Sequence, residues 1–326
     1  MKIASRFLLA VALTYATYSL SADTSKPREA VMPDNNWNTH YFGRFQLSLP
    51  QGSEIATDYK IFDEKIELVS KNGKSQLPVI TQRLIDDLEK GVARGTSSKY
   101  EKTIQLDNGS VLLLSRLSTL YTFNVYLLTS KNTLYHMMIK RVTPNGVPEA
   151  VENMRKLSNA IYFRRPDAAP PHGAFALEAG YSTLPNDQFF ESIYMGAQIE
   201  GHTGNYISLL TKSIVEKEPS LLERFEQKEY DPVVGELSNS GRLKTLRKNK
   251  RTAGGIEGEE VAVATEIDGK PFYAFQFEYD GTLESNTRPY IAIELGTHEN
   301  GSNFKSDEEA LAFWDELLQG FKPLPE

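Results

Sequence analysis

The sequence contains no cysteine among its 326 residues. This absence excludes disulfide bonds, a lipid anchor on an N-terminal cysteine, and every catalytic or metal site that needs a thiolate. A chain without disulfides must be held together by its hydrophobic core, and a chain of this length can form one. Any chemistry must therefore come from the other residue types.

Long apolar runs are also missing after the first twenty residues. At the N-terminus, Lys2 and Arg6 precede an apolar run from Phe7 to about Tyr18, and Ser19 and Ser21 supply small residues before a cleavage point. Polar residues interrupt this run, and it falls short of the roughly 20 apolar residues that a membrane span needs. We therefore predict a cleaved secretory signal peptide over residues 1–21 and no membrane span in the mature protein.

An excess of positive charge is missing as well. The chain has 36 Lys and Arg against 43 Asp and Glu, a formal net charge of −7, which becomes −9 when Lys2 and Arg6 leave with the signal peptide. An acidic protein of this kind is unsuited as a whole to nucleic acid or to anionic lipid.

One segment, GRLKTLRKNKRT, departs from the acidic background. Its basic residues are Arg242, Lys244, Arg247, Lys248, Lys250 and Arg251. A nucleic-acid patch would need interleaved aromatic residues, which this segment lacks. Two other interpretations stay open: an edge strand on which lysines discourage aggregation, and a docking surface for an acidic partner. On the second interpretation, the candidate partner-binding residues are Arg242, Lys244, Arg247, Lys248 and Lys250.

Motifs of known catalytic sites are missing too. There is no G-x-S-x-G or H-E-x-x-H motif, and the five histidines are scattered without helical pairing. They are His40, His136, His172, His202 and His298. We predict that the protein is not an enzyme and that it has no catalytic residues, metal or cofactor. A hydrolase assembled from distant Ser, Asp and His residues stays an alternative.

The segment RTAGGIEGEEVAVATEIDG, residues 251–269, is rich in glycine but does not fit a phosphate-binding loop. Such a loop needs a helix after the glycines, whereas here two acidic residues and the period-two pattern VAVATEI follow them. We therefore predict a tight turn that enters a strand.

Both halves of the chain alternate strand and helix patterns. Predicted strands cover 43–50, 59–70, 110–117, 121–130 and 133–142 in the first half, and 173–181, 191–199, 205–212, 259–267, 271–281 and 288–297 in the second. Predicted helices cover 77–92, 148–161, a segment after Pro219, and 306–321, where Ser306 and Glu309 predict a capping box. In the strand 271–281 one face is aromatic, and we expect the other face to meet water or a partner.

Three prolines and small residues in RRPDAAPPHG, residues 164–173, predict an exposed linker. With the signal peptide removed, 305 residues remain, which suits two domains. We predict an N-terminal α+β domain over 30–163 and a C-terminal α+β domain over 174–326. Each would be a mostly antiparallel sheet with one or two packed helices.

Several motifs together resemble a known family. They are YFGRFQLSLPQGSEI and HGAFALEAGYS, followed by TAGGIEGEEVAVA, RPYIAIELGT and SDEEALAFWDELLQGFKPLP. In order and spacing they resemble the type VI secretion immunity proteins that neutralise phospholipase effectors, over nearly the whole mature chain. The basic segment and TGNYISLLTKSIVEKEPS match no motif of that family.

The resemblance implies a periplasmic protein that binds a cognate lipase or phospholipase effector and blocks its activity, without a cofactor. Two linked domains would suit a clamp that grips one target from two sides. The main alternative is a periplasmic protein that binds a small molecule or lipid, which would need a deep apolar pocket.

Overall fold

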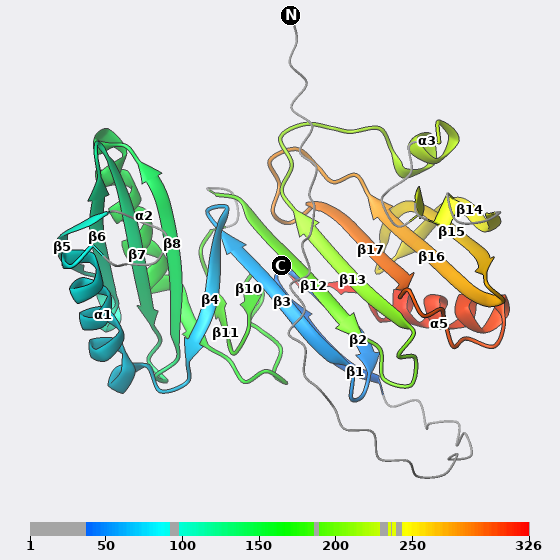
Figure 1. Ribbon diagram of the computed structural model, residues 1–326, viewed down its shortest axis with the longest axis horizontal. Coiled ribbons are helices and arrows are strands. Elements are labelled where there is room, and N and C mark those ends of the chain that lie inside the picture. Colours follow the sequence, from blue (N-terminus) through cyan, green and yellow to red (C-terminus); the bar gives the residue numbers. More distant parts are fainter. Residues whose placement is uncertain are drawn as a thin grey trace, which may run out of the picture. The chain divides into compact units, whose positions relative to one another are not determined.

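Twelve antiparallel strands form one sheet in the order β14-β15-β16-β17-β13-β12-β3-β4-β8-β7-β6-β5 (Figure 1). The computed structural model describes residues 37–91, 98–185, 189–228, 234–235, 237–238 and 243–325, all of which lie in one compact unit. The signal peptide predicted for residues 1–21 lies outside the described residues. The architecture is α+β and mostly antiparallel, as the sequence predicts.

The strands of the sheet fall into two groups along the chain. The first group is β3 (Glu54–Ile61), β4 (Glu64–Ser70), β5 (Lys99–Gln105), β6 (Val111–Leu117), β7 (Leu120–Leu128) and β8 (Leu134–Val142). The second group is β12 (Glu191–Gln198), β13 (Asn205–Lys212), β14 (Lys244–Ala253), β15 (Ile256–Ile267), β16 (Lys270–Tyr279) and β17 (Tyr290–Thr297). Strands β3 and β12 pair along their full length and join the two groups.

Two small sheets complete the strand structure. One has the order β1-β2-β18, and the other has the order β10-β11-β9. Their strands are β1 (Trp37–Phe42), β2 (Phe45–Pro50), β18 (Lys322–Pro323), β9 (Ile161–Phe163), β10 (Phe175–Leu177) and β11 (Gly180–Ser182). Because β18 pairs with β2, the last described residues lie against a strand near the start of the chain.

The predicted strand over 59–70 is in fact a hairpin. Phe62 and Asp63 adopt positive φ angles of 59° each and form the two-residue turn between β3 and β4. The sequence does not reveal this turn because neither residue is the glycine or asparagine that usually takes such angles. Only three residue pairs, from Tyr59–Ile66 to Ile61–Glu64, join β3 to β4.

Two helices cover opposite faces of the first group of strands. Helix α1 (Gly73–Glu89) packs with Leu113 and Tyr126, whereas α2 (Val147–Ala160) packs with Leu112 and Val125. These residues alternate along β6 and β7, as expected for two buried faces. Two 3-10 turns, Asp107–Gly109 and Pro144–Gly146, lie in the connecting loops.

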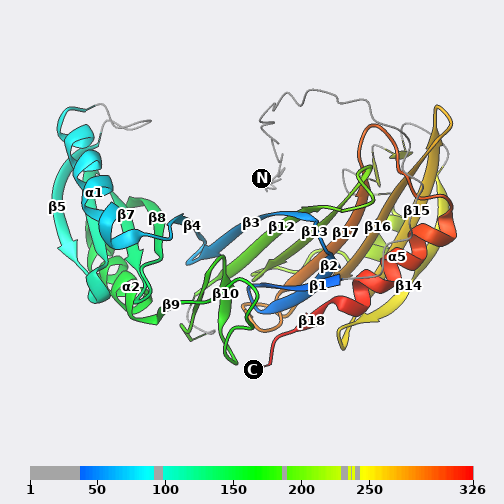
Figure 2. The same ribbon diagram turned by 90° about the horizontal axis from the view of Figure 1, so that it is seen from below.

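Helix α5 (Asp307–Gly320) covers one face of the second group, together with β2 (Figure 2). Trp314 and Phe321 are fully buried there, and Trp314 meets Phe275 of β16 edge-on at 6.1 Å. The predicted cap is present in part. Ser306 accepts from the Glu309 N–H at 3.3 Å, while the Glu309 carboxylate accepts from the N–H of Lys305 instead of Ser306.

The second face of β16 is covered as well, contrary to expectation. Ala274, Gln276 and Glu278 are all buried there. Helix α3 (Leu221–Glu226) and the residues after it form a separate apolar cluster on this face. Its members are Leu221, Val234, Leu237, Val261, Val263, Phe272 and Ala274. The sequence pattern did not reveal this because the covering segment lies some fifty residues earlier in the chain.

Candidate functional site

The glycine-rich segment forms the turn of the β14–β15 hairpin. Gly254 and Gly255 have φ angles of 57° and 82°, and the flanking residues Ala253 and Ile256 pair with each other. No helix follows the glycines, since β15 continues to Ile267. The prediction of a turn that enters a strand is confirmed.

The basic segment forms most of β14, and its side chains are largely paired within the chain. On the face toward α5, the Arg247 guanidinium donates two hydrogen bonds to Asp315, at 2.5 and 2.8 Å. Arg251 reaches the same carboxylate at 2.7 Å. These contacts raise the pKa of Arg247 and lower the pKa of Asp315, with the hydrogen bond between the two side chains as the largest cause.

A buried carboxylate lies beneath these two arginines. Glu260 of β15 is only 1% exposed, accepts from Arg251 at 2.6 Å and from the indole N–H of Trp314 at 2.7 Å. A buried charge is costly unless it is paired and hydrogen-bonded, and here both conditions are met. The cluster thus fastens α5 to the end of the sheet.

The other basic residues have weaker partners or none. Lys244 pairs with Asp307 at 2.6 Å, and Lys248 pairs with Glu226 at 2.8 Å and lies over the Phe225 ring. Lys250 forms no ion pair in the part of the chain that the structure describes. Arg242 lies outside the described residues. The five predicted partner-binding residues therefore do not form a uniformly free basic patch.

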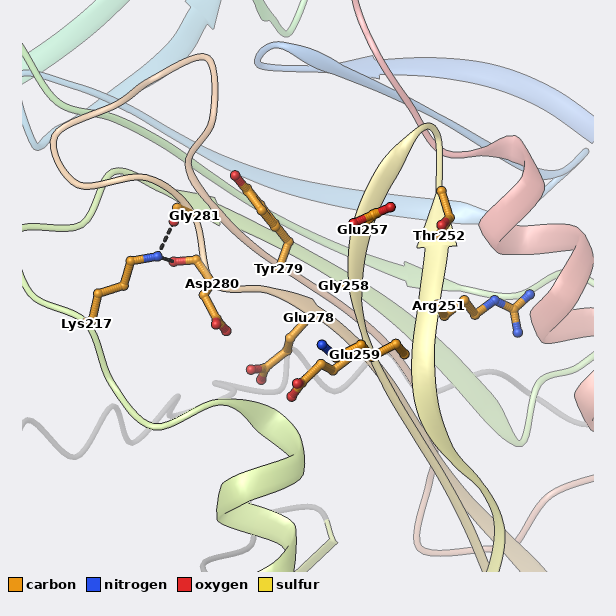
Figure 3. A pocket seen from close by; sticks show the side chains of 11 residues that line it. Lys217, Arg251, Thr252, Glu257, Gly258, Glu259, Glu278, Tyr279, Asp280 and Gly281 are labelled. Carbon is orange, nitrogen blue, oxygen red and sulfur yellow. Dashed lines mark hydrogen bonds between the residues drawn. The ribbon is translucent and has the colours of Figure 1, made fainter.

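A polar cleft of about 500 Å³ lies beside the hairpin (Figure 3). Its lining residues are Lys217, Lys250, Arg251, Thr252, Glu257, Gly258, Glu259, Glu278, Tyr279, Asp280 and Gly281. Figure 3 shows the Arg251 side chain directed away from Glu259 and Glu278. The Lys217 ammonium donates to the carbonyl oxygens of Asp280, at 3.0 Å, and of Gly281.

The carboxylates of this cleft have structural partners. Glu278 is 1% exposed and accepts two hydrogen bonds from Arg224, at 2.8 and 2.9 Å. Glu259 accepts from the Leu222 N–H at 2.8 Å and so caps the first turn of α3. Burial raises the pKa of Asp280, and the negative charge of Glu259 adds to the effect. Charged groups rather than apolar surface line this cleft.

A second, smaller cleft of about 220 Å³ lies where β3 and β4 diverge. Its lining mixes the polar residues Thr57, Lys65, Glu67 and Glu178 with the apolar or aromatic residues Tyr59, Ile66, Leu68, Tyr135 and Leu177. Neither cleft has the apolar lining that a lipid-binding protein requires.

The histidines lie in separate places. His136 contacts Asn124 at 3.2 Å, and His298 contacts Gln198 at 2.8 Å. His202 stacks on Phe304 with ring centroids 4.3 Å apart, and His40 stacks on Phe42. Among the described residues, no group of three or more histidine or acidic side chains could hold a metal ion.

A buried ion pair that sequence reasoning missed connects distant segments. Arg44, which follows β1, donates to both carboxylate oxygens of Glu191 at 2.6 and 2.9 Å, and also to the Gly173 carbonyl at 2.6 Å. Burial raises the pKa of Glu191 to about 7, against the opposing effect of Arg44. The arginine in YFGRF was visible in the sequence, but its partner lies 147 residues away.

The predicted linker is also more fixed than expected. Arg164 is 6% exposed and donates to the carbonyl oxygens of Leu177, Gly180, Ala168 and two neighbouring residues. At the other end, the Gly173 N–H donates to the Pro325 carbonyl at 3.0 Å. The proposed domain boundary within 164–173 stays a prediction, but this segment is held by contacts at both ends.

No helix in the described ranges is both long and apolar enough to cross a membrane. Residues 170–326 match the family described as the Tle cognate immunity protein 4 C-terminal domain. A comparison with curated proteins returns no match.

Three solved structures resemble nearly the whole chain. The apo immunity protein TplEi of the type VI secretion system from Pseudomonas aeruginosa is 28% identical, with a TM-score of 0.80 over 90% of this chain and 99% of that one. TplEi complexed with an "L" peptide is 28% identical, with a TM-score of 0.76 over 89% and 99%. The crystal structure of the Tle4-Tli4 complex gives 28% identity and a TM-score of 0.79 over 90% and 99%.

Proposed function

Because this chain belongs to the family of type VI secretion immunity proteins, we propose that it binds and inhibits a cognate phospholipase effector in the periplasm. It would thereby protect the cell that makes it from its own effector or from that of a sibling. The observation that carries the proposal is the likeness over 90% of the chain to an immunity protein that has been crystallised as a Tle4-Tli4 complex.

Inhibition of this kind requires a stable interface and no reaction at the inhibitor. A specific complex buries roughly 1,600 Å² in total, which covers about twenty residues or more on each partner. Bound over the mouth of a lipase or over its lid, such a surface blocks the access of phospholipid. The proposed activity therefore needs neither a cofactor nor a catalytic residue in this chain.

The predicted signal peptide supports the proposed location. A phospholipase delivered by a neighbouring cell meets its substrate at the membrane, so the inhibitor must be in the same compartment to bind it there. An exported protein without cysteine also needs no oxidation to fold. Loss of protection when residues 2–21 are deleted would support this location.

The likeness extends over both predicted domains, which supports a two-part grip on the effector. We propose a domain boundary within residues 164–173, with both domains contacting the effector in one interface. The basic residues of β14 are proposed contacts within it. Lys250 is the strongest of these, because it has no ion-pair partner in the described chain.

The alternative of a small-molecule or lipid-binding protein is less well supported. The two clefts described above, of about 500 and 220 Å³, are lined in large part by charged and polar residues. Specific lipid sites instead offer a mainly apolar surface with a few polar groups.

Toxicity rescue tests the proposal. The phospholipase effector encoded beside this gene is directed to the periplasm of a sensitive bacterium, with the full-length protein, with the protein lacking residues 2–21, or without it. We expect survival only with the full-length protein, and co-purification of the two proteins in a stable complex. Death of the cells despite abundant, folded, exported protein would refute the proposal.

A further inference from the structure

Strand β14 lies at one end of the large sheet, and no described strand pairs with its outer edge. Among the described residues, β15 is the only strand that pairs with it. β14 is ten residues long and extends to the hairpin turn at Gly254. A long edge strand presents a row of unpaired backbone N–H and C=O groups to which another strand can add.

The hairpin geometry identifies these groups. In a hairpin with a two-residue turn, the pair that flanks the turn is hydrogen-bonded, and the pairs then alternate along the ladder. Ala253 and Ile256 flank the turn, so the backbone groups of Thr252, Lys250 and Lys248 point to the open edge. The Asn249 side chain donates to the Lys250 carbonyl at 2.8 Å in an exposed contact, consistent with a carbonyl that lies outside the ladder.

β14 is held rigidly in its extended form. On the α5 face, Arg247 and Arg251 are fixed by Asp315, and Arg251 also reaches the buried Glu260. A strand that is already ordered loses little conformational entropy when a partner strand adds to it. The ion pairs to Asp315 and Glu260 therefore hold β14 in the conformation that accepts a further strand, although they neutralise part of its positive charge.

The charge of the strand selects the partner. The sequence of β14, KTLRKNKRTA, contains five basic residues and no acidic residue. Lys244 is 68% exposed, and such exposed ion pairs contribute little, so an additional carboxylate can share its charge. Lys250 has no ion-pair partner among the described residues. A second copy of the same strand would be repelled, whereas an acidic strand would be attracted.

We propose that β14 is a docking edge to which an extended acidic segment of the effector adds as a further strand. This inference rests on the proposed function and assigns part of the interface. Main-chain hydrogen bonds to Lys248, Lys250 and Thr252 would supply affinity, and the lysines would supply selectivity for acidic side chains.

Three variants at one position separate these two contributions. Lys250→Ala removes the side chain only, Lys250→Glu reverses its charge, and Lys250→Pro also removes the outward N–H. Proline is tolerated on edge strands where that N–H is unpaired. Lys102→Glu is the matched control, because Lys102 is an exposed lysine on β5, the edge strand at the other end of the sheet.

The measurement is the dissociation constant for the purified effector encoded beside this gene, at low and at high salt. We expect binding about threefold weaker for Lys250→Ala and about tenfold or more weaker for Lys250→Glu and Lys250→Pro. Lys102→Glu should bind like the unmodified protein. Added salt should weaken the unmodified complex more than the Lys250→Glu complex. Thermal unfolding of each free variant shows whether it is folded.

Hydrogen exchange of the complex tests strand addition directly and does not depend on any variant. We expect slowed exchange of the Lys248, Lys250 and Thr252 amides when the effector is bound. If the unmodified protein binds but these amides exchange as before, the docking edge is refuted and the proposed function stands. If the unmodified protein does not bind the effector, the proposed function fails, and the docking edge fails with it.

Discussion

Individual charged residues in this protein have partners that a sequence does not reveal. Glu260 and Glu278 are each 1% exposed, and each is bound by an arginine. Counting basic residues along β14 therefore overstates the charge that is available to a partner. Among the candidate contacts on β14, Lys250 alone has no ion-pair partner within the described residues.

The substitution Arg247→Glu is consequently a poor probe of partner binding, because it would place a third carboxylate beside Asp315 and Glu260. It should unfold or loosen the α5 contact before it reports on an interface. Lys250→Glu breaks no ion pair within the described chain, but it places a carboxylate opposite Glu259 on β15, so Lys250→Ala is the cleaner probe of partner binding.

Three partly buried histidines should make the stability of the protein depend on pH. Burial lowers the pKa of His40, His136 and His202 below the ordinary value of 6.5. The unfolded chain then takes up protons first as the pH falls, so the stability that these groups contribute is full above pH 6.5 and is lost below it. These histidines therefore lower the melting temperature between pH 7.5 and pH 5.5, and Glu191 opposes them there because its raised pKa of about 7 makes the folded protein take up a proton first. We expect the fall to be steeper in Glu191→Met, which lacks the opposing carboxyl group.

A pair of variants isolates one of these histidines. His202 stacks on Phe304 and faces Glu309, whose charge partly opposes the lowering of the His202 pKa. His202→Phe should reduce the dependence of the melting temperature on pH, while the exposed His172→Ala should leave it unchanged. Equal dependence in His202→Phe and the unmodified protein would contradict this assignment.

At the scale of elements, the sequence predicts correctly those elements whose determining residues all lie within one short segment. The hairpin at Gly254 and the helix α5 follow from turn residues, a capping serine and apolar spacing, all within one segment. The turn at Phe62 and Asp63 is not evident from the sequence, because it contains no glycine or asparagine and a phenylalanine rarely adopts positive φ. The cover of the second β16 face was missed because it depends on packing by α3, which a strand pattern cannot show.

The two glycines of the hairpin turn offer a matched test of how this element packs. Both have positive φ, so alanine costs about 1 kcal/mol at either position. A Cβ at Gly255 would meet open space, whereas one at Gly254 would lie 2.9 Å from the Lys322 Cα. We expect Gly254→Ala to lower the free energy of unfolding by at least about 1 kcal/mol more than Gly255→Ala.

Urea denaturation measures both glycine variants. A similar loss in the two would mean that the chain near Lys322 moves aside without cost. A larger loss in Gly254→Ala would show that the hairpin turn and the C-terminal strand support each other.

At the scale of the whole molecule, the strand pairing crosses the predicted linker. β3 pairs with β12 in eight residue pairs, and β18 pairs with β2. A sequence read segment by segment predicts the strands but not which distant strands adjoin, because pairing leaves no local pattern. The candidate site has the same limit: Lys250 was named from the sequence, whereas its place on an open edge required the sheet order.

The buried Arg44–Glu191 pair should affect the free energy of unfolding of the whole molecule. Replacing either residue alone leaves a buried charge, so Arg44→Met or Glu191→Met should each cost about 3–5 kcal/mol. The double variant removes both charges and should be more stable than either single variant. Urea denaturation of the three proteins measures this coupling, and simple addition of the two losses would contradict it.

The pairing of β18 with β2 also bears on the order in which the protein folds. The ribosome makes β2 long before its partner β18, which lies at Lys322–Pro323. Likewise β3 can pair with β12 only after the ribosome has made β12, more than a hundred residues later in the chain. Contacts of such large sequence separation form slowly. The growing chain therefore stays incompletely folded until β12 and β18 have both been made.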